Sequence, residues 1–184
     1  MLVNPIKNVK DIKAIKTILF NKQRDLFIFT LGINCGLRVG DLCKLKVSQF
    51  LNKNVGDIIN IIERKTGKAN FITINKEIYK NFRNYYDSTT LNDNDFIFKS
   101  REGKSHLHPY SVCRLIKKWC NDINLKGNYG NHTLRKTFGY QHRVNNNVGI
   151  EVLMKRFNHS SQYITQKYIG VDEDEIIDVC MKTI

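Results

Sequence analysis

The sequence predicts an α+β domain that is mainly helical and contains one small antiparallel β-sheet. Most of the chain repeats apolar residues at steps of three and four, which is the period of an amphipathic helix. Two short β-branched runs, residues 57–63 and 70–74, break that period and flank a turn at Thr66-Gly67. The length of 184 residues suits one domain, which can bury roughly 70% of its unfolded surface. We therefore expect a helical domain whose strands form a hairpin, or part of a small three-stranded sheet.

Three helices are expected before the hairpin. Residues 9–20 place their apolar side chains on one helical face, with lysines opposite. Residues 25–35 form a mostly apolar run, which predicts a core helix that ends at Gly36. A short helix at residues 39–45 follows the turn after that glycine.

Helical spacing returns after the hairpin. Residues 78–86 predict a helix, and residues 96–98 predict a brief extended segment. Pro109 opens the helix 109–120, because proline loses nothing it needs in a first helical turn. The remaining predicted helices are one capped by Asn131 or Thr133 and running to about Val144, then 149–157, 161–168 and one from Asp172 onwards.

The charge of the chain predicts a polyanionic partner. Thirty Lys and Arg against seventeen Asp and Glu give a net charge of +13, which points first to nucleic acid. A composition rich in Lys, Asn and Ile is the alternative explanation of the excess. Acidic residues crowd the last thirteen positions, so the rest of the chain is more basic still: Asp172, Glu173, Asp174, Glu175 and Asp178.

Apolar runs and cysteines exclude several classes of protein. No run approaches the ~20 residues of a membrane span, and the N-terminus lacks the apolar core of a signal peptide. We therefore expect a cytoplasmic protein without a membrane partner. The five cysteines include no CxxC pair and predict reduced thiols, with neither a disulfide framework nor a zinc site. His106 and His108 form an HxH that could hold a metal with a third ligand, or face a phosphate from a loop.

Several polar residues are candidates for chemistry. Arg38, in GLRVGDL, lies between a glycine-ended helix and the next one, and arginine suits a phosphate because its planar fork holds two oxygens. Asp41 is three residues on and could orient it. His132 and Arg135, in HTLR, share a helix face and could reach one anion. Taken singly, each has an ordinary explanation as an ion pair or a surface residue.

Further candidates lie at a turn and near the C-terminus. Lys65 stands at the predicted hairpin tip, where a solvated lysine is also common. His159 follows a break between predicted helices. In FNHSSQYITQKYIG, Tyr163 and Tyr168 could each be a nucleophile or plain helix packing.

Taken in order along the chain, these motifs resemble the catalytic domain of the tyrosine recombinases, the phage integrase family. The resemblance covers residues 10–168 and rests on GLRVGDL, ERKTGKA, HTLR, NHSS and a tyrosine nine residues after His159. It implies that Tyr168 is the nucleophile and that Arg38 and Arg135 clamp the scissile phosphate. It also implies Lys65 as the general acid, with His132 and His159 assisting.

The resemblance further implies a site-specific recombinase that cuts and rejoins double-stranded DNA through a 3′-phosphotyrosyl bond, without a metal or other cofactor. A homo-oligomer on DNA is expected. Tyr163 is left to packing or to a DNA contact. About half of the basic residues that we predict to contact the DNA backbone are also explained as the solvated faces of helices: Arg101, Lys104, Arg114, Lys117, Lys118, Lys136 and Arg143.

The sequence departs from the family pattern in a few places. Phe157-Asn158 precede His159 where leucine and glycine are common, and asparagine tolerates a left-handed backbone. Asp41 replaces the more usual glutamate, and we expect it to contact Arg38.

The predicted organisation is a catalytic domain over residues 1–170 and a tail helix over 171–184. The tail either docks on a neighbouring protomer or packs on its own domain. The N-terminal clamp domain of the family is expected to be absent, from an excised domain or a naturally short protein. A DNA-relaxing topoisomerase of the same chemistry and a non-catalytic DNA-binding accessory protein are the alternative functions.

Overall fold

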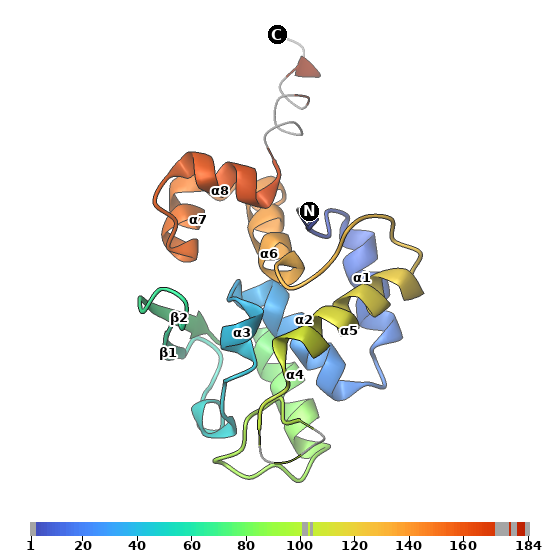
Figure 1. Ribbon diagram of the computed structural model, residues 1–184, viewed down its shortest axis with the longest axis vertical. Coiled ribbons are helices and arrows are strands. Elements are labelled where there is room, and N and C mark those ends of the chain that lie inside the picture. Colours follow the sequence, from blue (N-terminus) through green and yellow to red (C-terminus); the bar gives the residue numbers. More distant parts are fainter. Residues whose placement is uncertain (1–2, 101–102, 104, 172–176, 178–179, 183–184) are drawn as a thin grey trace.

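The computed structural model of the chain describes residues 3–100, 103, 105–171, 177 and 180–182. Its elements follow the predicted order of helices around a small sheet (Figure 1). The predicted helix from Asp172 lies mostly outside the described residues. The elements are α1 (Val9–Ile18), α2 (Gln23–Cys35), α3 (Val39–Leu42), a 3-10 turn (Val47–Gln49), β1 (Ile58–Ile62), β2 (Ala69–Thr73), α4 (Lys76–Asp87), α5 (Pro109–Asp122), α6 (Thr133–Val144), α7 (Ile150–Phe157) and α8 (Gln162–Ile169).

Helix α2 lies at the centre of the domain, between α4 and α6 (Figure 1). It is apolar on nearly every side, which is typical of a helix buried on all faces. As predicted, it ends at Gly36, whose φ of 62° is left-handed. A Cβ at Gly36 would lie 2.7 Å from the ring of Phe138, so the glycine allows both the turn and the close approach of α6. Arg38 lies two residues after this glycine, as the N-cap of α3.

The sheet is a hairpin. Strands β1 and β2 pair antiparallel, with Ile58 opposite Thr73 and Ile62 opposite Ala69. Within the described residues the sheet has two strands, so the hairpin alternative is confirmed. The predicted extended segment at 96–98 contributes only an isolated bridge between Lys46 and Phe96.

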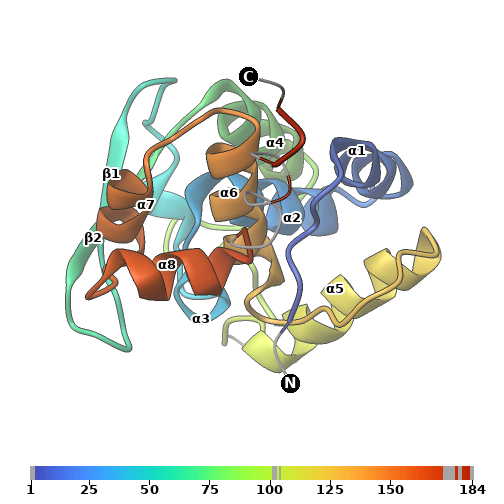
Figure 2. The same cartoon turned by 90° about the horizontal axis from the view of Figure 1, so that it is seen from above.

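Buried apolar side chains of the described residues form two clusters. The larger cluster is built on α2, α4 and α5, and it includes Leu134 at the start of α6. The smaller cluster lies under α7 and α8. Helix α6 therefore belongs to both, and Figure 2 shows α7 and α8 beside it, with α7 close to the hairpin. The smaller cluster consists of Phe138, Tyr140, Leu153, Phe157, Ile169 and Val171.

The start of α6 differs from the prediction. Its N-cap residue is His132, whose side chain makes no capping bond, and not Asn131 or Thr133. The hydroxyl of Thr133 instead accepts from the amide of Gly130 and donates to the carbonyl of Asn4. The second of these bonds is long-range, and the His132 ring, which caps nothing, is available for other contacts.

None of the helices in the described part of the chain is both long and apolar enough to cross a bilayer.

Candidate active site

The nucleophile candidate meets the start of α6. Tyr168 is on α8, and its hydroxyl lies 3.1 Å from Nδ1 of His132. The Tyr168 ring is half-buried and packs edge-on against Phe157 and His159, at 5.5 and 5.1 Å between ring centres. The start of α6 and the segment 157–159 therefore both lie against this phenol.

Arg135 is the most constrained cation of this group. It is 1% exposed, and its two terminal nitrogens donate to the carbonyls of Gly36 and Phe157, each at 2.8 Å. Its guanidinium also lies 4.6 Å from the centre of the Phe157 ring. The side chain thus joins the end of α2 to the end of α7, and its charge has a fixed position beside Tyr168.

Arg38 is oriented by Glu63, not by Asp41. Nη1 of Arg38 lies 2.5 Å from Oε2 of Glu63, a carboxylate with no exposed surface. Oδ1 of Asp41 instead accepts from the amide of Arg64 at 3.1 Å. The prediction that Asp41 contacts Arg38 is therefore corrected. Sequence reasoning missed Glu63, although a lone acid at the end of an apolar strand was a visible signal.

Lys65 is exposed on the loop between the strands, at the rim of a hollow of about 380 Å³. That hollow also contains Arg38 and His132, so the structure brings the hairpin lysine to the same site as the start of α6. The hollow is lined by Arg38, Val39, Gly40, Asp41, Arg64, Lys65, Pro109, Asn131 and His132.

The two histidines are held neutral. Burial, together with the charges of Arg135 and Arg38, lowers the pKa of His159 to about 4 and also lowers the pKa of His132. Nδ1 of His159 lies 3.1 Å from Oγ1 of Thr165. Burial raises the pKa of Tyr168, although the two arginines oppose that effect. At neutral pH the site therefore pairs a protonated phenol with an uncharged imidazole that can accept a proton.

The side chain of Lys136 packs over the ring of Tyr168. It is 5% exposed, and its ammonium is 5.2 Å from the centre of the Tyr168 ring. A buried side chain in this position does not face a DNA backbone, so the prediction of such a contact for Lys136 is corrected. Tyr163 is 66% exposed, which excludes the packing role and leaves the DNA contact as its remaining alternative.

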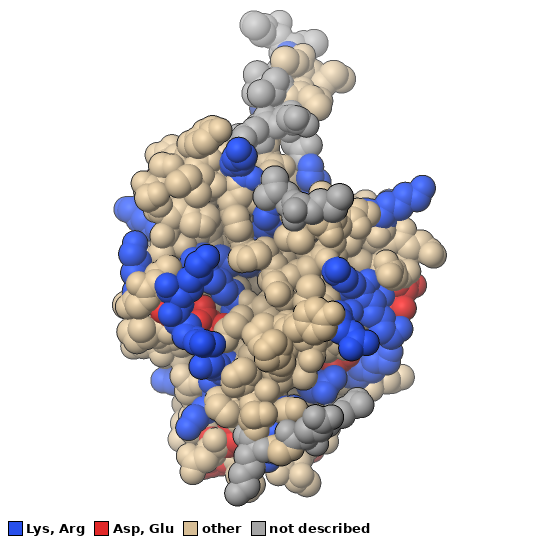
Figure 3. All heavy atoms as spheres, in the orientation of Figure 1, with Lys and Arg blue, Asp and Glu red and all other residues tan. Residues whose placement is uncertain are grey.

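The other predicted DNA contacts are on two parts of the surface. Arg114, Lys117 and Lys118 are exposed on α5, where Lys118 pairs with Asp122 at 3.0 Å. Arg143 is half-buried near the carbonyl of Val148. Figure 3 shows Lys and Arg gathered over α5 and, separately, over the hairpin and α3. Two further predicted contacts, Arg101 and Lys104, lie outside the described residues.

No trio of His, Cys, Asp or Glu in the described ranges is arranged to hold a metal ion. Within the HxH motif, His108 instead caps α5: its ring nitrogen accepts from the amide of Tyr110 at 3.2 Å.

Comparisons with known proteins agree with this geometry. Residues 7–175 match the model of the phage integrase family. The chain is 35% identical over 174 residues to the probable integrase/recombinase YoeC of Bacillus subtilis, covering 94% of this chain and 92% of that protein. It is 30% identical to the tyrosine recombinase XerA of Pyrococcus furiosus, covering 86% of this chain and 54% of that one. The chain thus spans most of the first relative and about half of the second.

Solved structures share the fold. A crystal structure of XerA recombinase superposes with a TM-score of 0.79 at 22% identity, covering 98% of this chain and 67% of that one. The structure of XerH recombinase bound to a palindromic difH substrate gives a TM-score of 0.75 at 15% identity, covering 98% of this chain and 53% of that one. The family match, the relatives and the fold agree, and the chain belongs to the phage integrase family of tyrosine recombinases.

Proposed function

We propose that this chain breaks and rejoins double-stranded DNA as a site-specific recombinase, with Tyr168 as the nucleophile. The contact between the Tyr168 hydroxyl and Nδ1 of His132, at 3.1 Å, carries the proposal. This nitrogen is within reach of the phenol proton, and the surrounding residues include Arg38, Lys65 and Arg135. A packing tyrosine would need none of these neighbours.

The first step is a transesterification. Nδ1 of His132 takes the Tyr168 proton, and the phenol oxygen forms a bond to the DNA phosphorus. The bond from phosphorus to the deoxyribose 5′-oxygen breaks, and that oxygen takes a proton from Lys65. The product is a 3′-phosphotyrosyl bond with a free 5′-hydroxyl. Attack by a second 5′-hydroxyl reverses these transfers and rejoins the strand.

The arginines supply the charge that this step needs. A phenol with an ordinary pKa near 10 is a weak nucleophile until its proton is removed and the phosphate is neutralised. Charge on the phosphorus intermediate spreads over its equatorial oxygens, where fixed donors stabilise it. Arg135 is already fixed by the two carbonyls it binds. Losing such a donor costs about 10²- to 10³-fold in rate in other enzymes.

Partners follow from the same chemistry. The XerH relative is solved on a DNA substrate, and the basic surface over α5 suits backbone contacts of this kind (Figure 3). Each chain offers one Tyr168, so exchange between duplexes needs several copies on DNA. We keep the 171–184 tail as the candidate contact between copies and the cytoplasm as the compartment.

The test starts from nicked duplexes with a randomised sequence, because the recombination site is unknown. Cleavage near a nick releases a short strand and traps the covalent product. We expect a protease-sensitive protein–DNA adduct, whose sequenced DNA defines the preferred site. The Tyr168→Phe chain should bind the recovered duplex and form no adduct. Binding without any adduct in the wild type would favour the accessory-protein alternative.

A further inference from the structure

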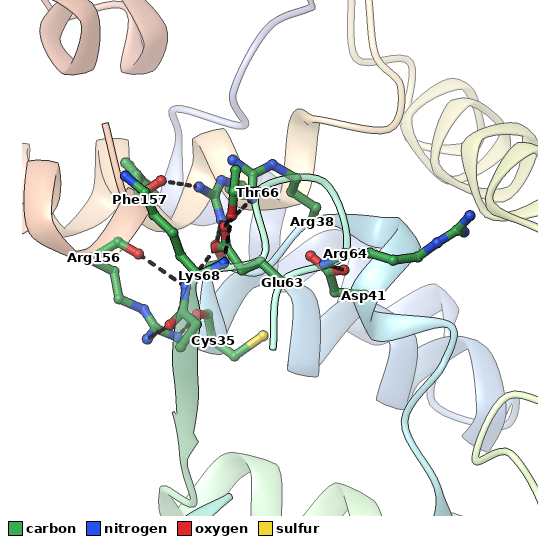
Figure 4. A network of polar contacts seen from close by, with 12 residues as sticks. Cys35, Arg38, Asp41, Glu63, Arg64, Thr66, Lys68, Arg156 and Phe157 are labelled. Atoms are coloured by element: carbon green, nitrogen blue, oxygen red, sulfur yellow. Dashed lines mark hydrogen bonds and ion pairs between the residues drawn. The ribbon is translucent and has the colours of Figure 1, made fainter. Parts of the chain in front are cut away.

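An ionised acid is buried within this basic site. Glu63 follows β1 directly, and its carboxylate has no exposed surface. Oε2 accepts from Arg38 and, at 2.7 Å, from the hydroxyl of Thr66, while Oε1 accepts from Asn70 at 2.7 Å (Figure 4). Burial alone would raise the pKa of Glu63, but these three bonds lower it to about 2. The carboxylate is therefore charged at neutral pH.

The same oxygen atom holds two parts of the proposed machinery. Arg38 belongs to the phosphate clamp, and Thr66 is the neighbour of Lys65 on the exposed loop. The backbone of Glu63 also bonds across this loop: its carbonyl accepts from Gly67 at 2.8 Å, and its amide donates to Lys68 at 2.9 Å. Glu63 thus sets the distance between the clamp and the loop that carries the acid.

Asn70 extends the chain of bonds to α7. Its Nδ2 donates to Glu63, and its Oδ1 accepts from Arg156 at 2.7 Å. The two neighbours fix the amide orientation, since a flipped amide would place donor against donor and acceptor against acceptor. Arg156 also donates to the carbonyls of Cys35, at the end of α2, and of Phe71, on β2. It therefore ties the hairpin and α2 to the helix that precedes His159.

From these contacts we infer that Glu63, Asn70 and Arg156 are positioning residues for the proposed cleavage. Glu63 holds Arg38 against the phosphate and, through Thr66, holds the Lys65 loop over the leaving oxygen. Asn70 and Arg156 lock that assembly to the nucleophile side of the domain. This inference rests on the proposed function, because it assigns the positioning to the same cleavage site.

The cleavage test uses two versions of the duplex recovered from the nicked pool. One carries the ordinary phosphate, and the other carries sulfur in place of the leaving 5′-oxygen. A thiolate has a conjugate-acid pKa of about 8.5 and leaves without a proton from Lys65. Thr66→Val should slow cleavage of the ordinary duplex by about 10²-fold, which is typical of a small misplacement. On the sulfur duplex it should regain most of the wild-type rate.

Glu63→Gln disturbs both groups that Glu63 holds, Arg38 and the Lys65 loop. It should lose at least as much rate as Thr66→Val on the ordinary duplex and regain only part of it with sulfur, because Arg38 is disturbed as well. Glu77→Gln is the matched control: it removes an exposed ion pair with Lys16, outside the site, and should match the wild type on both duplexes. Equal losses on both duplexes for Thr66→Val, or no loss at all, would overturn the inference.

A second measurement needs no DNA. The exposed loop contains three trypsin sites, after Arg64, Lys65 and Lys68. In the folded protein, Thr66→Val and Glu63→Gln should speed cleavage there at least several-fold relative to the exposed site after Lys126, and Glu77→Gln should not. An unchanged loop would contradict the positioning role even if Glu63→Gln folds poorly, since Thr66 is exposed. If the wild type forms no adduct while Thr66→Val and Glu63→Gln still speed cleavage of the loop, the proposed function fails and the network of contacts stands.

Discussion

The two apolar clusters carry different halves of the proposed site. The larger one supports α3 and the hairpin, and therefore Arg38, Glu63 and Lys65. The smaller one lies under α7 and α8, and therefore supports His159 and Tyr168. Arg38 and Lys65 thus rest on one cluster, and Tyr168 rests on another with fewer buried side chains.

Polar bonds and one helix join these halves. Helix α6 belongs to both clusters. Arg135, on α6, donates to one backbone carbonyl on each side, and Arg156, on α7, donates to two carbonyls on the other side. A segment with less buried apolar area opens more readily, so we expect the nucleophile side to be the more adjustable part of the domain. The comparison teaches that arginine bonds, together with the packing of α6 on α2, set the position of Tyr168 relative to Arg38.

Removing Arg135 should have the largest effect, because this side chain bonds to both halves of the site. Arg135→Ala leaves the carbonyls of Gly36 and Phe157 without their donor and takes a cation from Glu63, 3.8 Å away. Each buried carbonyl left without a donor costs about 1–3 kcal/mol, and we expect a loss of that order in urea unfolding. Adduct formation should fall by at least about 10²-fold. Arg135→Lys keeps the charge without the fork and should recover little of either; wild-type stability in Arg135→Ala would refute the bridging role.

Low pH should protonate Glu63 and remove the stabilisation that its charged carboxylate provides. Because the pKa of Glu63 is about 2 when folded and 4.5 ordinarily, the unfolded chain takes up the proton first as the pH falls. The stabilisation is complete above pH 4.5 and is lost toward pH 2. At roughly 1.4 kcal/mol per pH unit it amounts to about 3 kcal/mol. Urea unfolding between pH 2 and 6 should show this slope flattened in Glu63→Gln but not in Glu77→Gln; parallel slopes would contradict it.

A methyl group at Gly139 should displace the nucleophile side alone. A Cβ there would lie 2.5 Å from Ile169, next to Tyr168, and 2.9 Å from the Phe157 ring. Overpacking of this kind costs about 1–3 kcal/mol. A small shift of α8 should slow adduct formation by about 10²-fold. Two results would contradict this comparison. Gly139→Ala could keep the wild-type rate of adduct formation, or it could change amide hydrogen exchange equally in α2 and α8.

The smallest expected effect is a difference between Lys136 and Lys117 in the salt dependence of DNA binding. Lys136→Met removes a cation over the Tyr168 ring, worth about 0.5–2 kcal/mol, and should leave the salt dependence of DNA binding unchanged. Lys117→Met, on the exposed face of α5, should reduce the slope of log affinity against log salt by about 1. Binding titrations at several salt concentrations distinguish the two variants. A reduced slope for Lys136→Met would show that Lys136 contacts the DNA backbone.

The local parts of this structure could be predicted from the sequence. Gly36 ends the core helix in a left-handed turn, and Asn158 adopts a φ of 54° at the break before His159, as its residue type suggested. Helical periods and the hairpin signal depend on neighbours within a few residues. The order of the motifs then indicated which side chains belong together.

The pairings between segments could not be read in the same way. Three features depend on contacts across the fold: Glu63 in place of Asp41 as the partner of Arg38, the burial of Lys136, and the long-range bond of Thr133, the residue expected to cap α6. Periodicity gives the face of a helix, but not which residue of another segment it meets. The acid in an apolar strand was the one sign of a buried network, and a partner for it had to come from the fold.

The most direct measurement maps the covalent bond to DNA. After trapping on the duplex recovered from the nicked pool, nuclease and protease digestion followed by mass spectrometry should find the nucleotide on Tyr168. Tyr163→Phe should retain the adduct, and Tyr168→Phe should lose it while the protein stays folded. An adduct that persists in Tyr168→Phe, or that maps to Tyr163, would contradict the assignment of the nucleophile.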